Sequence, residues 1–305
     1  MNYLKLIRYQ NLLMLAFMQL VFRYLFLKQS AVDLALTDFN YILLIIATVS
    51  IAAGGYVINN IMDQETDAIS KPQNRVVGVS ISETVAYNWY IGLTILGVAL
   101  GFYLSNVIYK PTFASLFILV ATLLYVYATS LKQIPVVGNI IVAALLSVSI
   151  VIIAFFDILP AIDQDNRIRM KEAFSILMDY AIFAFIINLI REIVKDLEDM
   201  DGDYQTGMNT LPIAIGIQKT KAIVGILTVI AVLLLAYYLK TSLYELDYTI
   251  YYALVFIIGP LVYFGAKLSI AKEKKEFHHL SMVLKGVLFF GILSVAVIVY
   301  TLKNA

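Results

Sequence analysis

The chain has 305 residues, of which 61% are hydrophobic and only 14% are charged, and its mean hydropathy is +0.86. A soluble domain carries roughly 25% charged residues, so this composition excludes a soluble enzyme and indicates an integral membrane protein. The net charge of +1 provides no field for binding nucleic acid. The chain has no cysteine, which excludes disulfides and thiolate metal sites.

Apolar segments recur along the whole chain, and a transmembrane helix needs roughly 20 such residues. The alternating pattern of strands is absent, and an open sheet cannot lie in lipid. The first segment has no small-residue cleavage site after it, so we expect it to be retained as a helix. No linker divides the chain, which predicts one domain, residues 1–305. We therefore predict an all-α, polytopic membrane protein of about nine transmembrane helices, near residues 11–28, 40–62, 86–105, 112–130, 136–156, 173–194, 221–240, 248–270 and 281–302.

The distribution of Lys and Arg predicts the orientation. Nine spans place the N-terminus and the 2–3, 4–5, 6–7 and 8–9 connections on one side, which carries 14 of the 22 basic residues, Lys71 among them. Such an excess marks the cytoplasmic side. We therefore expect a multi-pass protein of the cell inner membrane with these connections in the cytoplasm. Arg23 lies inside the first span, close enough to its end for us to expect that it snorkels to the interface.

The first polar cluster follows the second apolar segment and reads NNIMDQETD, residues 59–67. At 100° per residue, its two amides and two of its carboxylates share about 100° of helical arc, and Glu65 lies outside it. The segment therefore presents one acidic face at a membrane boundary, formed by Asn59, Asn60, Asp63 and Asp67.

The second polar cluster lies in the 6–7 connection, INLIREIVKDLEDMDGDYQTGMNTLP, residues 187–212. We expect the sixth span to continue through it as a helix. Asp201 then points away and is a surface residue. The other polar groups share about 140° of arc, namely Asn188, Arg191, Glu192, Lys195, Asp196, Asp199 and Asp203.

Two acidic faces on one side of a membrane indicate a metal site, although either alone would usually be a solvated surface. Clustered carboxylates repel one another unless a cation lies between them. Oxygen ligands without cysteine favour magnesium or calcium over zinc, and magnesium commonly keeps open positions for substrate phosphates. A lipid-soluble diphosphate fits both the acidic groups and the apolar spans, and an allylic prenyl diphosphate is the obvious class. Its ionisation requires neutralisation of the leaving group's charge by metal, Lys and Arg and exclusion of water.

Three motifs resemble those of the UbiA superfamily of intramembrane prenyltransferases. N-N-x-x-D-x-x-x-D at 59–67 is similar to the family's first motif, N-D-x-x-D-x-x-x-D. R-E-x-x-K-D-x-E-D-x-x-G-D at 191–203, followed by G-x-x-T-L-P at 207–212, is similar to the second acidic motif. YATSLKQIPVVGN at 127–139 resembles the conserved element after span 4. The order of the motifs and the nine helices also agree, so the resemblance implies a UbiA-like prenyltransferase bundle.

The resemblance implies Mg²⁺ as cofactor and assigns roles to individual residues. Asp63, Asp67, Asp196 and Asp199 would be catalytic. Asn60 stands where the family commonly has Asp, so we assign it a hydrogen-bonding role. The metal ligands would be Asn59, Asp63, Asp67, Asp196, Asp199 and Asp203. Diphosphate or acceptor would be bound by Asn59, Asn60, Arg75, Lys132, Asn188, Arg191 and Lys195.

The form of the second motif is most similar to that of digeranylgeranylglyceryl phosphate synthases, enzymes of lipid biosynthesis. This resemblance implies that the partners are a polyprenyl diphosphate and a lipophilic acceptor in the bilayer, with geranylgeranylglyceryl phosphate as acceptor. An aromatic quinone precursor or a chlorophyllide remains open as the acceptor. A secondary transporter is a distant alternative, because its polar groups would lie near the bilayer midplane, whereas these clusters lie at span ends. The sequence leaves the donor chain length and the oligomeric state open.

Overall fold

The protein is represented by a computed structural model that describes residues 2–30, 32–70 and 72–304, so that Lys71 lies outside the described residues. Within these ranges the regular structure is helical, with only an isolated bridge between Val77 and Ile81 and no strand. Nine helices in the described ranges are long and apolar enough to cross a membrane. The predicted all-α fold with nine spans is confirmed.

The spans follow one another along the chain with short connections. The last part of the eighth span begins at Gly259, with Pro260 in its first turn, and a π-helical turn at Leu254–Ile258 precedes it. Proline has no N–H to continue the helical ladder, which accounts for the irregular turn. The helices of the first five spans and their connections are α1 (Asn2–Leu6), α2 (Tyr9–Val21, continued by turns to Ser30), α3 (Asp38–Met62), α4 (Gln64–Ser70), α5 (Glu83–Val107), α6 (Ala114–Thr129) and α7 (Val137–Ile153, continued by turns to Ala161). The remaining helices are α8 (Arg167–Gln205), α9 (Leu211–Ile215), α10 (Ile217–Ser242), α11 (Asp247–Ala253), α12 (Gly259–Ile270) and α13 (Lys274–Asn304).

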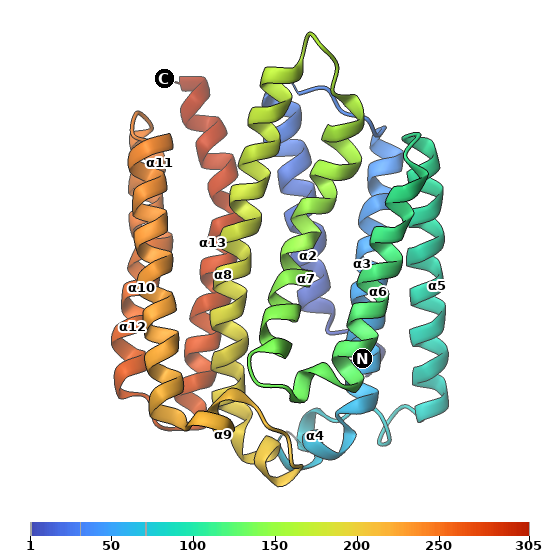
Figure 1. Ribbon diagram of the computed structural model, residues 1–305, viewed down its shortest axis with the longest axis vertical. Coiled ribbons are helices and arrows are strands. Elements are labelled where there is room, and N and C mark those ends of the chain that lie inside the picture. Colours follow the sequence, from blue (N-terminus) through green and yellow to red (C-terminus); the bar gives the residue numbers. More distant parts are fainter. Residues whose placement is uncertain (1, 31, 71, 305) are drawn as a thin grey trace.

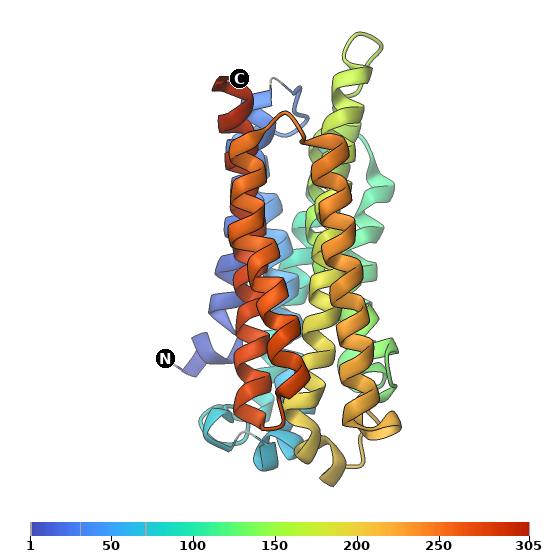
Figure 2. The ribbon, with the colours of Figure 1, turned by 90° about the vertical axis from the view of Figure 1, so that its left-hand side faces the viewer.

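The spans stand side by side, with α2 and α7 in the middle of the bundle (Figure 1). The helices α3, α5 and α6 lie on one side of this pair, and α8 and α10 to α13 lie on the other. The short helices α4 and α9 lie together at one end, at the opposite end from the C-terminus (Figures 1 and 2). We call this end the motif side and define it by the connections 63–82, 130–136, 206–216 and 271–273.

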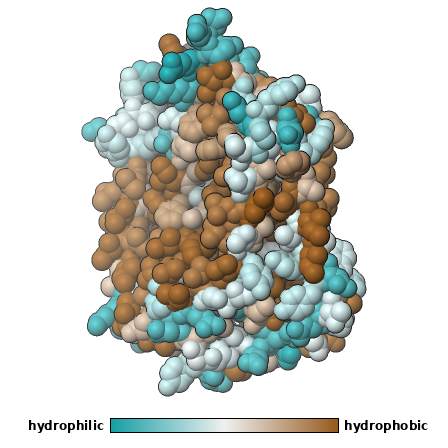
Figure 3. All heavy atoms as spheres, turned by 45° about the vertical axis from the view of Figure 1, so that its right-hand side comes forward, coloured by the Kyte–Doolittle hydropathy of each residue, from teal (hydrophilic) through white to brown (hydrophobic). Residues whose placement is uncertain are grey.

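The outer surface has the hydropathy pattern of a membrane protein. A broad apolar band covers the middle of the bundle, and hydrophilic residues gather at both ends (Figure 3). Large apolar side chains such as Ile95, Leu233 and Val255 are each 63% exposed on this band. Such contiguous exposure is stable only against lipid or another apolar surface. The chain is therefore an integral, multi-pass membrane protein.

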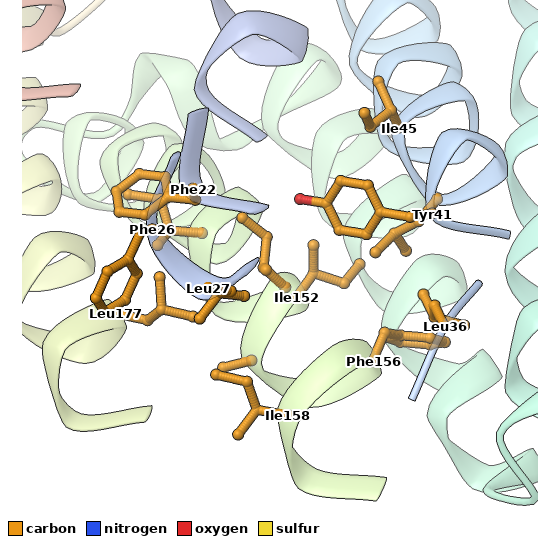
Figure 4. Packing of buried hydrophobic residues seen from close by; sticks show 14 of the residues in the cluster. Phe22, Phe26, Leu27, Leu36, Tyr41, Ile45, Ile152, Phe156, Ile158 and Leu177 are labelled. Atoms are coloured by element: carbon orange, nitrogen blue, oxygen red, sulfur yellow. The ribbon is translucent and has the colours of Figure 1, made fainter. Parts of the chain in front are cut away.

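The largest buried cluster closes the end of the bundle opposite the motif side. It packs Phe22 and Leu27 of the first span against Tyr41 of α3, Phe156 of the fifth span and Leu177 of α8 (Figure 4). These side chains come from four spans, so the cluster fixes the ends of the spans relative to one another.

Arg23 lies inside this cluster, and the expectation that it snorkels is wrong. The residue is 1% exposed, and its guanidinium forms an ion pair with the fully buried Asp157. It also donates to the Leu36 carbonyl at 2.7 Å and lies 4.4 Å from the centre of the Tyr41 ring. A buried charge is stable only when paired and hydrogen-bonded. Asp157, distant in sequence, supplies that partner, and the sequence analysis did not identify it.

Candidate active site

The first motif spans the break between α3 and α4 and nevertheless keeps helical spacing. The Asp63 N–H donates to the Asn59 carbonyl at 2.9 Å, and the Asp67 N–H donates to the Asp63 carbonyl at 2.8 Å. Because this i to i−4 ladder continues through the break, the three side chains follow one another along one face. Glu65 is exposed, as predicted.

Asp63 is held from two sides. Its Oδ2 accepts a hydrogen bond from Asn59 Nδ2 at 2.7 Å, and its Oδ1 forms an ion pair with Lys132, whose side chain is only 9% exposed. Lys132 lies in the turn before α7. Gly138 allows that turn to approach, because a Cβ at this position would lie 2.9 Å from the Lys132 Cα. The Oδ1 atom of Asn59 is buried and has no hydrogen-bond partner among the described residues, so a carbonyl oxygen is available for a ligand.

Asn60 forms hydrogen bonds, as predicted, and they are directed to the backbone. Its Nδ2 donates to the Leu6 carbonyl at 3.1 Å and to the Tyr56 carbonyl at 2.8 Å. These bonds attach the N-terminal segment to α3. A contact with substrate stays a prediction for this residue.

The second motif lies on α8, which continues without interruption to Gln205, as predicted. Asp196 Oδ2 accepts a hydrogen bond from Asn139 Nδ2 at 2.8 Å. Glu192 accepts from Lys195 at 2.9 Å and from Arg191 at 3.2 Å. Asp203 is buried and Asp201 is exposed, as predicted. The sequence predicted that Asp203 lies on the polar face of the helix and that Asp201 points away from it, and the burial of these two residues confirms this.

The remaining predicted residues lie on the same side or line the nearby interior. Asn188 is 7% exposed and its Nδ2 donates to the Ala184 carbonyl at 2.8 Å. Arg75 lies in the 63–82 connection, and its buried Nε has no hydrogen-bond partner in the described ranges. Asp199 lies farther along α8, with its Oδ1 4.0 Å from Lys274 Nζ.

One short segment before and within α7 contacts both acidic faces. Lys132 pairs with Asp63 of the first motif, and Asn139 donates to Asp196 of the second. Asn139 ends the tract YATSLKQIPVVGN, in which the family resemblance implies a role only for Lys132. The side chains of Thr66 on α4 and Thr206 after α8 are also within 3.3 Å of each other. The structure therefore brings the two motifs to one place.

The chemistry of the donors fits magnesium. Carboxylates and an amide carbonyl are the ligands that this ion prefers, and the chain has no cysteine to favour a softer metal. Across the ranges 2–30, 32–70 and 72–304, no three carboxylate or histidine side chains lie close enough together to hold a metal ion. One oxygen of Asp63 and one of Asp196 are engaged by Lys132 and Asn139.

Two elongated cavities meet at the motifs. The α3–α7 cavity lies between α3, α6 and α7, and the α8–α13 cavity lies between α2, α8, α10 and α13. Asn59, Glu192 and Lys195 line only the first, whereas Asn188 and Lys285 line only the second. The walls of both cavities are mainly apolar, which would keep water from a reactive intermediate.

Comparison with known proteins gives consistent matches along most of the chain. A sequence model of the UbiA prenyltransferase family matches residues 16–291. The chain is 33% identical to the digeranylgeranylglyceryl phosphate synthase of Saccharolobus solfataricus over 245 residues, which is 79% of either chain. It is 30% identical to the enzyme of the same name from Methanobrevibacter smithii over 268 residues, which cover 87% of this chain and 89% of the other.

Solved structures show the same architecture. A structure of a digeranylgeranylglyceryl phosphate synthase superposes with a TM-score of 0.61 and 27% identity, covering 99% of this chain and 98% of the other. A UbiA homologue from Archaeoglobus fulgidus bound to geranyl diphosphate (GPP) and Mg²⁺ superposes with a TM-score of 0.62 and 16% identity, covering 97% of this chain and 99% of that one.

Proposed function

The chain belongs to the UbiA prenyltransferase family, and from this premise we propose that it transfers a geranylgeranyl group from geranylgeranyl diphosphate to geranylgeranylglyceryl phosphate. The relatives that it resembles over more than three quarters of its length bear the name of that activity. The observation that carries the proposal is that the segment of Lys132 and Asn139 contacts Asp63 of one motif and Asp196 of the other, while Asn59, which donates to Asp63, lines a mainly apolar cavity. That arrangement suits a substrate with an anionic head and a long apolar tail.

The donor's diphosphate would lie between the two acidic faces, together with Mg²⁺. Asn59, Asp63 and Asp67 of the first motif and Asp196, Asp199 and Asp203 of the second would hold the metal. When bound, it would neutralise the charge that develops on the leaving diphosphate. Lys132 and Arg191 would supply further positive charge to the non-bridging oxygens.

The reaction proposed is a substitution at the allylic C1 atom of the donor. The bond between C1 and oxygen breaks, and both electrons leave with diphosphate. The hydroxyl oxygen of the acceptor then forms a bond to C1, and its proton passes to the released diphosphate. The apolar walls, including Tyr127 on α6 and Leu146 on α7, would exclude water, which would otherwise convert the allylic cation into an alcohol.

The proposed orientation places the motif side in the cytoplasm. Its support is the excess of Lys and Arg on this side, 14 of the 22 in the chain.

The test is a transfer assay on purified protein in detergent with magnesium and geranylgeranyl diphosphate. Geranylgeranylglyceryl phosphate, 4-hydroxybenzoate and dihydroxynaphthoate are supplied separately, and products are identified by mass spectrometry. A doubly prenylated glycerol phosphate is the expected product. Formation of a prenylated aromatic product would confirm prenyl transfer but show that the proposed acceptor is wrong.

A further inference from the structure

The two cavities lie next to each other and share a polar junction near the motifs, and Leu15, Leu146 and Ser149 also line both of them. Figure 1 shows α2 and α7 between the helices that enclose the two cavities. Both cavities are lined by Asn11, Tyr56 and Arg191. At this junction Asn11 accepts a hydrogen bond from Lys285 at 3.1 Å and hydrogen-bonds to Tyr56. The guanidinium of Arg8 lies 5.4 Å from the centre of the Tyr56 ring.

The charged groups at this end differ between the two cavities. The α3–α7 cavity is lined by Asn59 and Glu192, and Glu192, Asp196 and Asp63 all act electrostatically on Tyr127 in its wall. The same cavity is also lined by Arg8, Arg191 and Lys195. Its end therefore combines motif carboxylates with cations, which suits a diphosphate bound together with a metal.

The α8–α13 cavity has a cationic end. Arg191 and Lys285 line it, and none of the motif carboxylates does. The Nε atom of Arg191 is buried and has no hydrogen-bond partner among the residues that the structure describes. Arg191 donates to Glu192 at 3.2 Å, but Glu192 does not line this cavity. A guanidinium and an ammonium with no motif carboxylate in the lining suit a phosphate monoester directly, without a metal.

The far end of the α8–α13 cavity is polar again. Asp179 lines it and accepts a hydrogen bond from Tyr238, and the hydroxyls of Tyr180 and Ser294 lie 2.7 Å apart. Asp179 and Arg191 are twelve residues apart on the same helix, which corresponds to about 18 Å at 1.5 Å per residue. The α8 wall between these levels is mainly apolar, with Phe183, Ala184 and Ile187. An extended geranylgeranyl chain has a comparable length.

We propose that the two cavities divide the two substrates between them, an assignment that rests on the proposed function. The acceptor lipid occupies the α8–α13 cavity, with its phosphate on Arg191 and Lys285 and its tail extending toward Asp179. The donor's prenyl chain occupies the α3–α7 cavity, with its diphosphate at the end that carries Asn59 and Glu192. The acceptor hydroxyl and the donor C1 atom then meet at the junction beside Tyr56.

Matched variants that fill one cavity at a time test this assignment. Ala184 lines only the α8–α13 cavity, and Ala52 on α3 lines only the α3–α7 cavity. Binding of geranylgeranylglyceryl phosphate alone and of geranylgeranyl diphosphate with magnesium alone is measured for each. We expect Ala184→Phe to raise the dissociation constant of the acceptor about tenfold or more and to leave that of the donor unchanged, because an added ring displaces the chain. Ala52→Phe should have the reverse effect.

Lys285→Met is a second acceptor-side variant that removes charge and keeps the shape of the side chain. It should weaken binding of the acceptor and leave binding of the donor unchanged. Folding of each variant is checked by gel filtration in detergent, and Lys285→Met still tests the assignment if a phenylalanine variant does not fold. If Ala184→Phe or Lys285→Met weakens donor binding instead, the assignment is rejected while the proposed function stands. The same holds if the variants of each cavity weaken binding of both ligands. If the wild-type protein forms no doubly prenylated product, both are rejected.

Discussion

Lys132, in the turn before α7, pairs with Asp63, at the end of α3, across 69 residues of sequence. Both side chains are mostly buried, at 9% and 17% exposed. The same carboxylate also accepts a hydrogen bond from Asn59. Asp63 is therefore fixed in position from two directions, so its orientation does not depend on the substrate.

Asp63→Asn is expected to lower kcat by about a hundredfold or more, the magnitude typical for loss of a preorganised electrostatic contact. The change keeps the size of the side chain but removes the charge that the metal and Lys132 require. Asp201→Asn is the matched control, because Asp201 is exposed on the outer side of α8, and its kcat should stay within about twofold, as for other surface substitutions. Steady-state transfer assays on both purified variants check this. Full activity in Asp63→Asn would contradict the proposed role.

Gly138→Ala is expected to lower activity by displacing Lys132. An added Cβ would lie 2.9 Å from the Lys132 Cα and 3.0 Å from the Leu131 carbonyl oxygen, and backbone atoms cannot move as cheaply as a flexible side chain. A shift of about 1 Å in a positioned group can cost roughly a hundredfold in rate. The control is Gly225→Ala on α10, where an added Cβ would have no atom of the described residues within 4 Å. Transfer rates are compared at equal amounts of folded protein, and equal rates for the two variants would show that this approach is not required.

The sequence predicted those features that depend on periodicity within one segment. The continuation of α8 through Asp203 and the outward direction of Asp201 follow from 100° per residue along a single helix, and the structure agrees. The first motif also follows this rule, because its hydrogen-bond ladder persists across the break at Asp63. These positions depend only on the spacing of residues along a single helix, which can be calculated from the sequence.

The features that sequence analysis missed depend on contacts between distant segments. Asn139 reaches Asp196 across 57 residues, and Arg23 reaches Asp157 across 134. No pattern within either segment specifies such a pair. A signal was nevertheless present for the second pair, because one cation and one anion lie near the same-side ends of two apolar spans. Single charges in lipid-embedded spans need partners, so pairing them was the better prediction for Arg23.

Removal of divalent metal is expected to stop transfer completely, because the proposed reaction requires neutralisation of the leaving diphosphate. Excess EDTA is added to the assay, and magnesium is then restored above the chelator concentration. Activity should disappear and then return to its initial rate. Geranylgeranylglyceryl phosphate should still bind in EDTA if Arg191 and Lys285 hold its phosphate, and this is measured by equilibrium binding. Continued turnover in EDTA would reject metal-assisted ionisation.

The Arg23–Asp157 pair is expected to contribute to stability, and its loss should leave the chemistry at the motif side unchanged. Asp157→Leu removes the buried counter-ion of Arg23 and leaves only the exposed Asp38, 3.2 Å away. We expect a cost of about 3–5 kcal/mol. The double variant Arg23→Met, Asp157→Leu removes both charges and should recover much of that loss, because well-packed apolar replacements of a buried pair are often neutral. Arg169→Met is the control. The side chains of Arg169 and its partner Asp33 are 50% and 57% exposed, and such surface pairs contribute only about 0–1 kcal/mol. Thermal unfolding in detergent gives the order of stability, and the same low Tm for the single and double variants would show that lost packing is the cause.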